Sequence, residues 1–412
     1  MESRYDIIIA GGGMVGASLA LAVGCALPGV RMLIVESFAL PPGEGAPAFQ
    51  PSFDARSTAL SAGSRRIYET MGAWSQLQPG LCPIDSIHVS SRGRPGSTLM
   101  QAAAEGLPAL GYVVENHWLG RVLMAQLKRR PHIEWCAPAR VQGVRLEGAG
   151  DCRVEVSRDG EPYEVACELL VVADGQDSGL ARALGIGYAD TDYGHSAIIA
   201  NVTTSKPHEG RAFERFTGQG PLALLPLLPT GGRSRSALVW TMPTALAGDL
   251  AASADGDFLE ALQQRFGFRL GRLERVGERF HYPLRLLEAS EQVRSGVAIM
   301  GNAAHSLHPV AGQGFNLALR DIARLVEALV AARQQGQSLG ELSVLQAYLD
   351  AQRWDQRKTT LFSDRVSAVF AWSQPLVGVA RDISLTALDV VLPAKSWFVR
   401  QAAGLSGDDP RW

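Results

Sequence analysis

The first 36 residues alternate between short apolar runs and a helical pattern. Residues 5–10 and 31–35 are runs of the length and composition of buried strands. Three glycines, Gly11 to Gly13, follow the first run, and residues 14–22 then show the apolar content of a buried helix. The pattern therefore predicts a strand, a tight turn, a helix and a second strand, the repeating unit of a parallel α/β sheet.

The middle of the chain changes its hydrophobic period twice. Residues 53–61 are predicted to lead into a helix that continues through Ile67, Met71 and Trp74. Residues 84–113 alternate apolar and polar positions in short pieces, which predicts strands outside the first sheet. A helix is predicted over residues 116–130. Residues 133–172 predict several strands, and the last of them, residues 168–173, is a near-continuous apolar run typical of a buried parallel strand.

Residues 195–285 differ from what precedes them. Strand-like runs are separated by Gly, Pro and Ser, and only one helix is obvious, over residues 257–266. We interpret this part as a mostly antiparallel sheet. Residues 295–300 then return to a buried strand, a long helix is predicted to begin near Phe315, and residues 341–412 read as helical with an aromatic-rich apolar stripe.

The glycines of the first turn have the spacing of a dinucleotide-binding motif. Gly11, Gly13 and Gly16 form G-x-G-x-x-G, Met14 begins the helix, and Glu36 lies twenty residues after Gly16. Glycine permits the turn and the close approach of a pyrophosphate to the backbone, the helix N-terminus attracts its charge, and an acid can bind a ribose diol. This stretch leaves NAD and FAD both open.

A second glycine-rich loop distinguishes between these two dinucleotides. The strand at 295–300 runs into Gly301 and Asn302, and Gly312, Gln313 and Gly314 precede the long helix. Backbone N–H groups at such a helix start can bind the anionic edge of a reduced flavin, and nothing in a nicotinamide requires them. FAD is therefore the predicted dinucleotide.

Three further positions are candidates for the same site, each with a plain alternative. Asp174 and Gly175 follow the buried strand at the edge where open α/β sheets bind ligands, although an ordinary Asp-Gly turn explains them equally well. Arg56 can supply charge to a phosphate or ribityl group, or pair locally with Asp54. Arg121 lies off the apolar stripe of its predicted helix and can face a ligand.

Composition excludes several classes of function. A net charge of −2 gives no attraction to nucleic acid. The five cysteines are scattered without metal-ligand spacing, so we expect free thiols and no metal site. We expect no signal peptide and no membrane span, and hence a cytoplasmic protein. P-loop, zinc-protease and serine-hydrolase motifs are absent from the sequence.

Together these motifs resemble the aromatic-ring flavoprotein monooxygenases, the para-hydroxybenzoate hydroxylase family. Its landmarks occur here in order over about residues 5–320: the first glycine motif with Glu36, then residues 172–175, then residues 301–314 with Pro309. Within the family, residues 54–61 and 308–317 are similar to the ubiquinone-biosynthesis hydroxylases. One position departs from the family pattern, because Asn302 stands where Asp is usual, which keeps an acceptor oxygen but loses the charge.

The resemblance implies a fold and a set of ligand-binding residues. It implies a Rossmann-type FAD-binding domain interleaved with a mostly antiparallel substrate domain and followed by a helical C-terminal region. The FAD-binding domain would comprise residues 1–75, 100–185 and 286–345, the substrate domain 76–99 and 186–285, and the helical region 346–412. The implied cofactor-binding residues are Gly11, Gly13, Met14, Gly16, Glu36, Arg56, Arg121, Asp174, Gly175, Gly301, Asn302, Pro309, Gly312, Gln313, Gly314 and Asn316.

The resemblance also implies an activity. The expected enzyme binds FAD tightly, takes electrons from NAD(P)H, consumes O2 through a flavin C4a-hydroperoxide, and hydroxylates a polyprenylated methoxyphenol. No catalytic base is identified: His195, Tyr193 and His305 each have ordinary structural explanations. The apolar C-terminal stripe suggests peripheral association with the inner membrane, a partner protein or a bound prenyl tail. The alternatives are hydroxylation at another ring position, an oxygen-independent flavin reductase of isoprenoid compounds, and a non-catalytic binder of prenylated molecules.

Overall fold

The computed structural model describes residues 3–40, 56–93, 97–148, 150–306, 312–371, 404 and 411–412. Its first layer is an eight-stranded sheet whose central order is β18-β19-β11-β1-β2-β8. The strands β1, β2, β8, β11 and β19 run parallel, as the buried apolar runs predicted. Their bounds are β1 Arg4–Ala10, β2 Met32–Val35, β8 Ile133–Cys136, β11 Glu161–Val172, β18 Val293–Arg294 and β19 Val297–Ile299.

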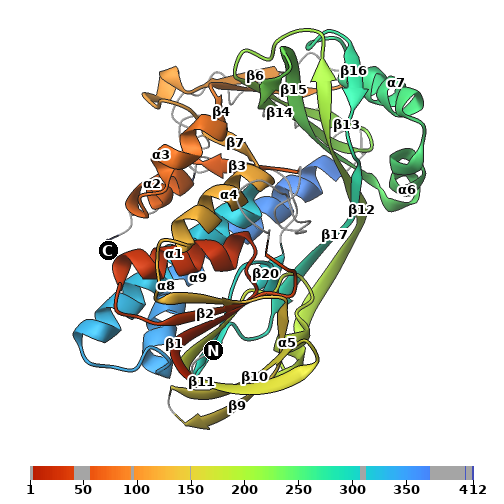
Figure 1. Ribbon diagram of the computed structural model, residues 1–412. Coiled ribbons are helices and arrows are strands. Elements are labelled where there is room, and N and C mark those ends of the chain that lie inside the picture. Colours follow the sequence, from red (N-terminus) through yellow and green to blue (C-terminus); the bar gives the residue numbers. More distant parts are fainter. Residues whose placement is uncertain are drawn as a thin grey trace.

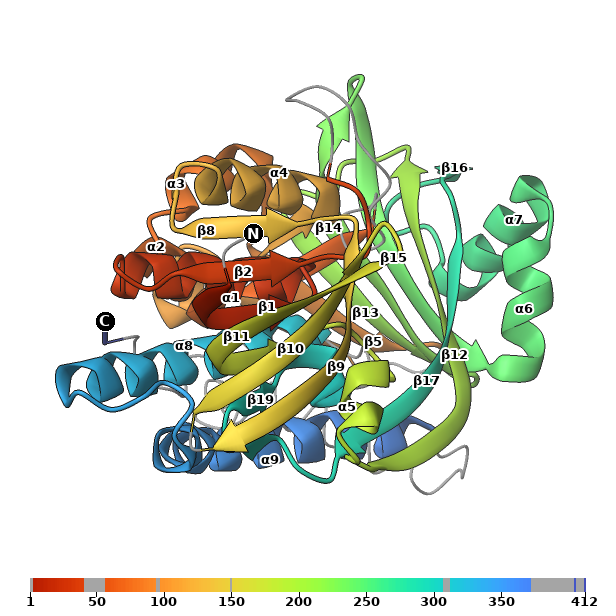
Figure 2. The ribbon, with the colours of Figure 1, turned by 60° about the horizontal axis from the view of Figure 1, so that its bottom comes forward.

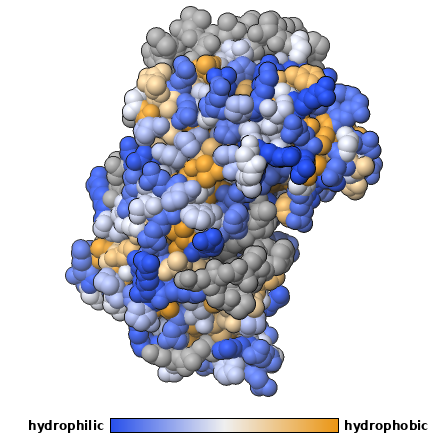
Figure 3. Space-filling view, turned by 45° about the horizontal axis from the view of Figure 1, so that its top comes forward, coloured by the Kyte–Doolittle hydropathy of each residue, from blue (hydrophilic) through white to orange (hydrophobic). Residues whose placement is uncertain are grey.

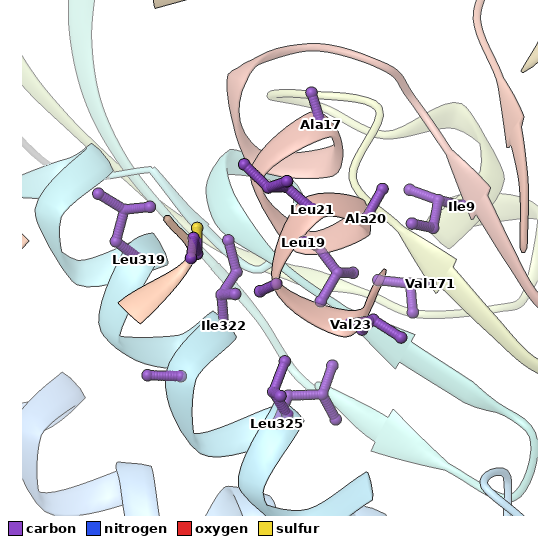
Figure 4. Close-up of a cluster of buried hydrophobic side chains, with 14 of the residues drawn as sticks. Ile9, Ala17, Leu19, Ala20, Leu21, Val23, Val171, Leu319, Ile322 and Leu325 are labelled. Carbon is purple, nitrogen blue, oxygen red and sulfur yellow. The ribbon is translucent and has the colours of Figure 1, made fainter. Parts of the chain in front are cut away.

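Helices cover one face of this sheet and a β-meander covers the other. Ile7 and Ile9 of β1 pack with helices α1 (Met14–Ala26), α4 (Asn116–Leu127) and α8 (Gln313–Gln334). Ile8 points the opposite way, into a second cluster with strands β9 (Ala139–Gly148) and β10 (Asp151–Arg158). Figure 4 shows α1 between the sheet and α8, with Leu319, Ile322 and Leu325 facing it. This packing fixes the first turns of α1 and α8 on the same side of the sheet.

The second layer is a nine-stranded sheet of order β20-β17-β12-β15-β14-β13-β5-β6, with β16 beside β12. It is mostly antiparallel, as predicted. Helices α6 (Thr244–Ala252) and α7 (Asp255–Phe266) lie on its outer face (Figures 1 and 2). The strands are β5 Ser86–Ser91, β6 Ser97–Gln101, β12 Tyr188–Thr204, β13 Arg211–Thr217, β14 Gly220–Thr230, β15 Arg233–Pro243, β16 Leu273–Val276, β17 Phe280–Ala289 and β20 His305–Ser306.

A three-stranded sheet, β3-β7-β4, lies between these layers. Its strands are β3 Ser57–Ser61, β4 Leu81–Ile84 and β7 Gly111–Glu115. Helices α2 (Ala62–Thr70) and α3 (Trp74–Leu77) lie between β3 and β4 in the chain. Glu115 at the end of β7 forms an ion pair with Arg235 of β15 and accepts a hydrogen bond from Asn201 Nδ2 at 3.4 Å. The small sheet therefore ties the large antiparallel sheet to the rest of the molecule.

Several boundaries differ from the sequence prediction. Residues 57–61 form strand β3 rather than leading directly into a helix, and α6 was not predicted at all. The C-terminal helix α9 spans Leu342–Ala371, and the apolar positions expected beyond it lie outside the described residues. No helix in the described part of the chain is both long and apolar enough to cross a membrane. On the face shown in Figure 3, apolar residues are dispersed among polar ones over the part that is coloured.

Candidate functional site

The turn between β1 and α1 is closed so tightly that two of its positions require glycine. Gly11 has φ +104°, and a Cβ there would lie 2.4 Å from the carbonyl oxygen of Ala173. A Cβ on Gly16 would lie 1.9 Å from the carbonyl oxygen of Gly11. The N–H of Gly11 donates to Val35 O at 2.8 Å, so β2 holds the turn in place. The backbone of the turn is thereby fixed and accessible to a ligand.

The start of α1 offers uncapped backbone N–H groups next to a fixed carboxylate. Gly13 is the N-cap and provides no side-chain cap, and Met14 is the first helical residue. Glu36 is only 6% exposed and accepts hydrogen bonds from the N–H groups of Gly12 and Phe38, at 2.7 and 2.9 Å. Its oxygens keep lone pairs for further donors. The free N–H groups, which can bind a phosphate, therefore lie beside the Glu36 carboxylate, which can bind a ribose.

Gly12 is a site residue that the sequence analysis did not single out. Its N–H fixes the Glu36 carboxylate, and a Cβ at this position would lie 2.5 Å from Cζ3 of Trp135. The signal was present in the sequence, because three consecutive glycines exceed what the G-x-G-x-x-G spacing requires.

Asp174 and Gly175 lie directly beside the first turn. The N–H of Ala173 donates to Ala10 O at 2.8 Å, which continues the β1–β11 pairing to the edge of the sheet. Ser178 Oγ donates to the Asp174 carboxylate at 2.8 Å, while desolvation at the strand end raises the pKa of Asp174 above its usual range. Gly175 has φ +100° and open space where a Cβ would stand.

The third glycine segment contacts the first helix. Gly301 begins the short 3-10 turn η3 (Gly301–Ala303), has φ +62°, and would place a Cβ 2.9 Å from Cγ2 of Val15. Met300 N–H donates to Val172 O at 2.9 Å and anchors this segment to β11. Asn302 is exposed, so its amide is available to a ligand.

Helix α8 also begins without a side-chain cap. Gly312 is its N-cap, with φ +60°, and a Cβ there would lie 3.3 Å from Cβ of Ala59. Gln313 is buried, while Gly314 faces open space. The first N–H groups of α8 are thus arranged like those of α1, as an anion-binding helix start.

Asn316 holds this helix start in position. Its Oδ1 accepts from Ser61 N and Ser64 Oγ at 2.8 and 2.6 Å, and its Nδ2 donates to Ala59 O and Gly312 O at 2.8 and 2.7 Å. An amide has four such positions, and all four are used within the protein. We therefore propose that Asn316 positions the loop rather than contacting the cofactor directly.

The two arginine candidates lie against aromatic rings. Arg56 donates to the hydroxyl of Tyr282 at 2.7 Å and lies over the rings of Phe280 and Tyr282. Arg121 is exposed on α4 and lies 4.9 Å from the ring centre of Trp118. Pro309 and Asp54, like the rest of residues 41–55 and 307–311, are outside the described residues.

Two of the groups considered as a catalytic base, His195 and His305, lie beside ordinary structural neighbours. His195 Nδ1 lies 2.8 Å from the carbonyl oxygen of Tyr193, two residues earlier in β12. His305 is 5% exposed, with Nε2 3.3 Å from a carboxylate oxygen of the fully buried Asp321. The five cysteines are free thiols, and no His, Cys, Asp or Glu cluster able to hold a metal occurs among the described residues.

Taken together, the residues fit FAD. Helices α1 and α8, whose starts are both uncapped, pack in one core cluster. The turn η3 approaches α1 where Gly301 lies against Val15, and Ala173 lies against Gly11. An extended dianionic ligand can therefore be bound at both ends by backbone N–H groups. Glu36 and the exposed Asn302 add side-chain partners for hydroxyl groups between and beside these ends.

Comparisons with known proteins agree with this arrangement. Residues 4–352 match the family described as FAD binding domain. The chain is 35% identical to the ubiquinone hydroxylase UbiL of Rhodospirillum rubrum, over 98% of this chain and 92% of that protein. It is 29% identical to the 3-demethoxyubiquinol 3-hydroxylase of Escherichia coli, over 97% and 98%. In fold it is similar to the p-nitrophenol 4-monooxygenase PnpA from Pseudomonas putida DLL-E4, with a TM-score of 0.77 at 18% identity, covering 98% and 99%.

Proposed function

Because the chain belongs to the FAD-binding-domain family of flavoprotein monooxygenases, we propose that it hydroxylates a 2-polyprenyl-6-methoxyphenol in ubiquinone biosynthesis. The resemblance of residues 210–217 and 220–226 to 2-polyprenyl-6-methoxyphenol hydroxylase supports this ring among the precursors. The observation that supports the proposal is the close approach of Gly301 to Val15, where a Cβ on the glycine would lie 2.9 Å from Cγ2, because it brings two glycine segments distant in sequence next to each other.

We propose that the chain's own residues divide the binding of the cofactor. The N-terminus of α1 holds the pyrophosphate, Glu36 the adenosine ribose, and Asn302 a ribityl hydroxyl. The N–H groups at Gly312 to Gly314 bind the anionic edge of the ring, helped by the dipole of α8. Bound FAD would supply the redox chemistry with NAD(P)H and O2, while the protein orients the phenol and excludes water.

A second candidate function is supported by one observation. The relative from Escherichia coli is named a 3-demethoxyubiquinol 3-hydroxylase, which acts on a different ring precursor. Hydroxylation at that position is therefore the alternative. Oxygen uptake distinguishes the isoprenoid-reductase alternative, because a reductase would oxidise NAD(P)H without consuming oxygen.

The prenyl tail and membrane association belong to the same proposal. Trp354 and Leu361 of α9 are 65% and 52% exposed and lie two turns apart, on one side of the helix. We propose that this apolar side contacts either the tail of the substrate or the membrane surface from which a prenylated substrate is taken.

The test is product analysis with a matched set of phenols. The purified protein, reconstituted with FAD, is expected to be yellow and to consume NAD(P)H and O2 when a 2-geranyl-6-methoxyphenol is added. Mass spectrometry should then find one added oxygen atom. Demethoxyubiquinol with the same tail is the comparison substrate. If the protein hydroxylates it in preference to the methoxyphenol, the alternative function is supported in place of the proposed one. NAD(P)H oxidation without oxygen uptake would contradict both.

A further inference from the structure

One row of residues crosses the inner face of the nine-stranded sheet. Glu214 of β13 is paired with Val89 of β5 on one side and Ala223 of β14 on the other. The register continues through Val239 and Ile199 to Phe280 of β17. Residues directly opposite one another in a sheet share a face, so all six side chains point the same way.

This row faces the interior of the molecule rather than helices α6 and α7. Phe213, the neighbour of Glu214, packs with Phe258 and Phe266 of α7. Ala212 packs instead with Ile84 and other residues of the small sheet, and by alternation Glu214 lies on the side of Ala212. Each of the six residues in the row is partly accessible, whereas Phe213 on the outer face is buried. The six residues of the row, called the floor below, are therefore partly accessible on the inner face of the sheet.

The floor is apolar except for one carboxyl group. Glu214 is the single ionisable residue of the six, and no hydrogen-bond donor or cation contacts it among the described residues. Other acids of this region are paired with arginine, such as Asp190 with Arg285 and Glu115 with Arg235. An unpaired carboxyl costs free energy in an apolar setting, which favours a functional role.

The end of the row at Phe280 lies next to the proposed cofactor site, and Glu214 lies four strands from it across the same face. Phe280 lies under Arg56, at 5.5 Å from its guanidinium carbon to the ring centre. Arg56 leads into β3, whose Ala59 contacts Gly312 at the start of α8. The inner face therefore extends from Glu214 to the neighbourhood of the helix start proposed to bind the flavin ring, and we place the substrate against this face.

We propose that Glu214 is a catalytic residue, whose carboxylate binds the phenol hydroxyl of the substrate and accepts its proton. The inference rests on the proposed function in supposing a phenol. The O–H bond breaks, the proton passes to a Glu214 oxygen, and the electron pair stays on the phenol oxygen. The resulting phenolate is a better nucleophile at its ring carbons, so no other group is needed to activate it.

The test compares Glu214→Gln with Glu274→Gln in the FAD-loaded protein. Glutamine keeps the size of Glu214 and can still donate to the phenol oxygen, but it cannot accept the proton at neutral pH. Glu274 is an exposed acid of β16 in the same sheet and serves as the control. Glu214→Asp, which keeps the acid on a shorter side chain, is the second variant should the glutamine variant fail to retain flavin.

Two readouts are measured with 2-geranyl-6-methoxyphenol. The first is the ultraviolet difference spectrum of the phenol on binding to the oxidised enzyme. It shows whether the bound phenol forms a phenolate at a pH below its ordinary pKa of about 10. The second is the rate of product formation with this phenol and with a ring-fluorinated, more acidic analogue. We expect Glu214→Gln to lose the phenolate band and about 100-fold in rate. The loss should shrink with the acidic analogue, and Glu274→Gln should match the wild type.

The outcomes separate this inference from the proposed function. If Glu214→Gln keeps the phenolate band and the rate, the role of Glu214 is overturned while the hydroxylase function stands. If the wild type ionises the bound phenol through Glu214 but forms no hydroxylated product, the role stands and the proposed function fails. If the wild type neither ionises nor hydroxylates the phenol, both are overturned.

Discussion

Glu214 has a cost in stability that can be measured without any ligand. Desolvation among apolar neighbours raises the pKa of its carboxyl from 4.5 to about 7. The folded state therefore holds this proton more tightly than the unfolded chain does. As the pH rises from about 4.5 to about 7, the unfolded chain gives up the proton first, so the free energy of unfolding decreases over that window.

We predict that Glu214→Gln makes the protein more stable at pH values above about 7 and leaves it unchanged below about 4.5. A pKa difference of one unit corresponds to about 1.4 kcal/mol, so the shift from 4.5 to about 7 gives a gain of about 3.5 kcal/mol at most. Urea unfolding midpoints at several pH values measure it. Parallel pH curves for the variant and the wild type would show that Glu214 is not desolvated in the folded protein.

At the level of elements, the decisive feature is the packing of α1 against the strand that precedes it. The backbone of Gly11 occupies the space into which a side chain at position 16 would project, so the helix start and the turn are one rigid unit. Any side chain at position 16 has to push α1 away from β1. The helix N-terminus then moves away from the phosphate position that the turn defines.

We predict that Gly16→Ala weakens FAD binding while Gly29→Ala does not. Gly29 is exposed and has no atoms within 4 Å of a built Cβ, so it controls for the substitution itself. Overpacking costs about 1–3 kcal/mol, which corresponds to about a ten- to hundredfold loss of affinity if it falls on the bound state. The flavin-to-protein absorbance ratio and an FAD titration measure it. Full flavin retention by Gly16→Ala would separate this turn from the cofactor.

The sequence predicted those elements whose signals are local. The strands of the parallel sheet and the glycine turns were predicted because apolar runs and glycines act within a few residues. Helix α6 was missed because only Ala247 of its residues is buried, which leaves no apolar stripe. The contact of Gly301 with Val15 depends on tertiary packing across nearly the whole chain, and no local pattern contains it.

The role of Glu214 shows the same limit more sharply. Strands were correctly predicted within residues 195–285, and β13 is one of them, but a shift of one residue in its pairing would turn Glu214 to the outer face, toward α7. The register with β5 and β14 decides which face it occupies, and register is a property of three strands rather than one. Glu214 could therefore be proposed as a base only once the pairing of the strands was known.

At the scale of the whole molecule, the cofactor would bind segments that lie far apart along the chain. The start of α1, the end of β11, η3 and the start of α8 meet at one edge of the parallel sheet. Arg56 reaches from β3 to the rings of β17 in the second sheet. A ligand held by both helix starts binds only the folded arrangement, and such a ligand stabilises the fold by mass action.

We predict that removing FAD lowers the thermal midpoint by at least a few °C and that added FAD restores it. A ligand present at about 100 times its Kd contributes about 2.7 kcal/mol to the free energy of unfolding. Gly16→Ala should lose most of this FAD-dependent increment, and its apo midpoint should fall as well, because the clash with Gly11 is present without the ligand. Thermal denaturation of wild type and variant across an FAD titration measures both effects. Identical midpoints with and without FAD would mean that the two helix starts do not share one ligand, since a ligand spanning both must oppose their separation on unfolding.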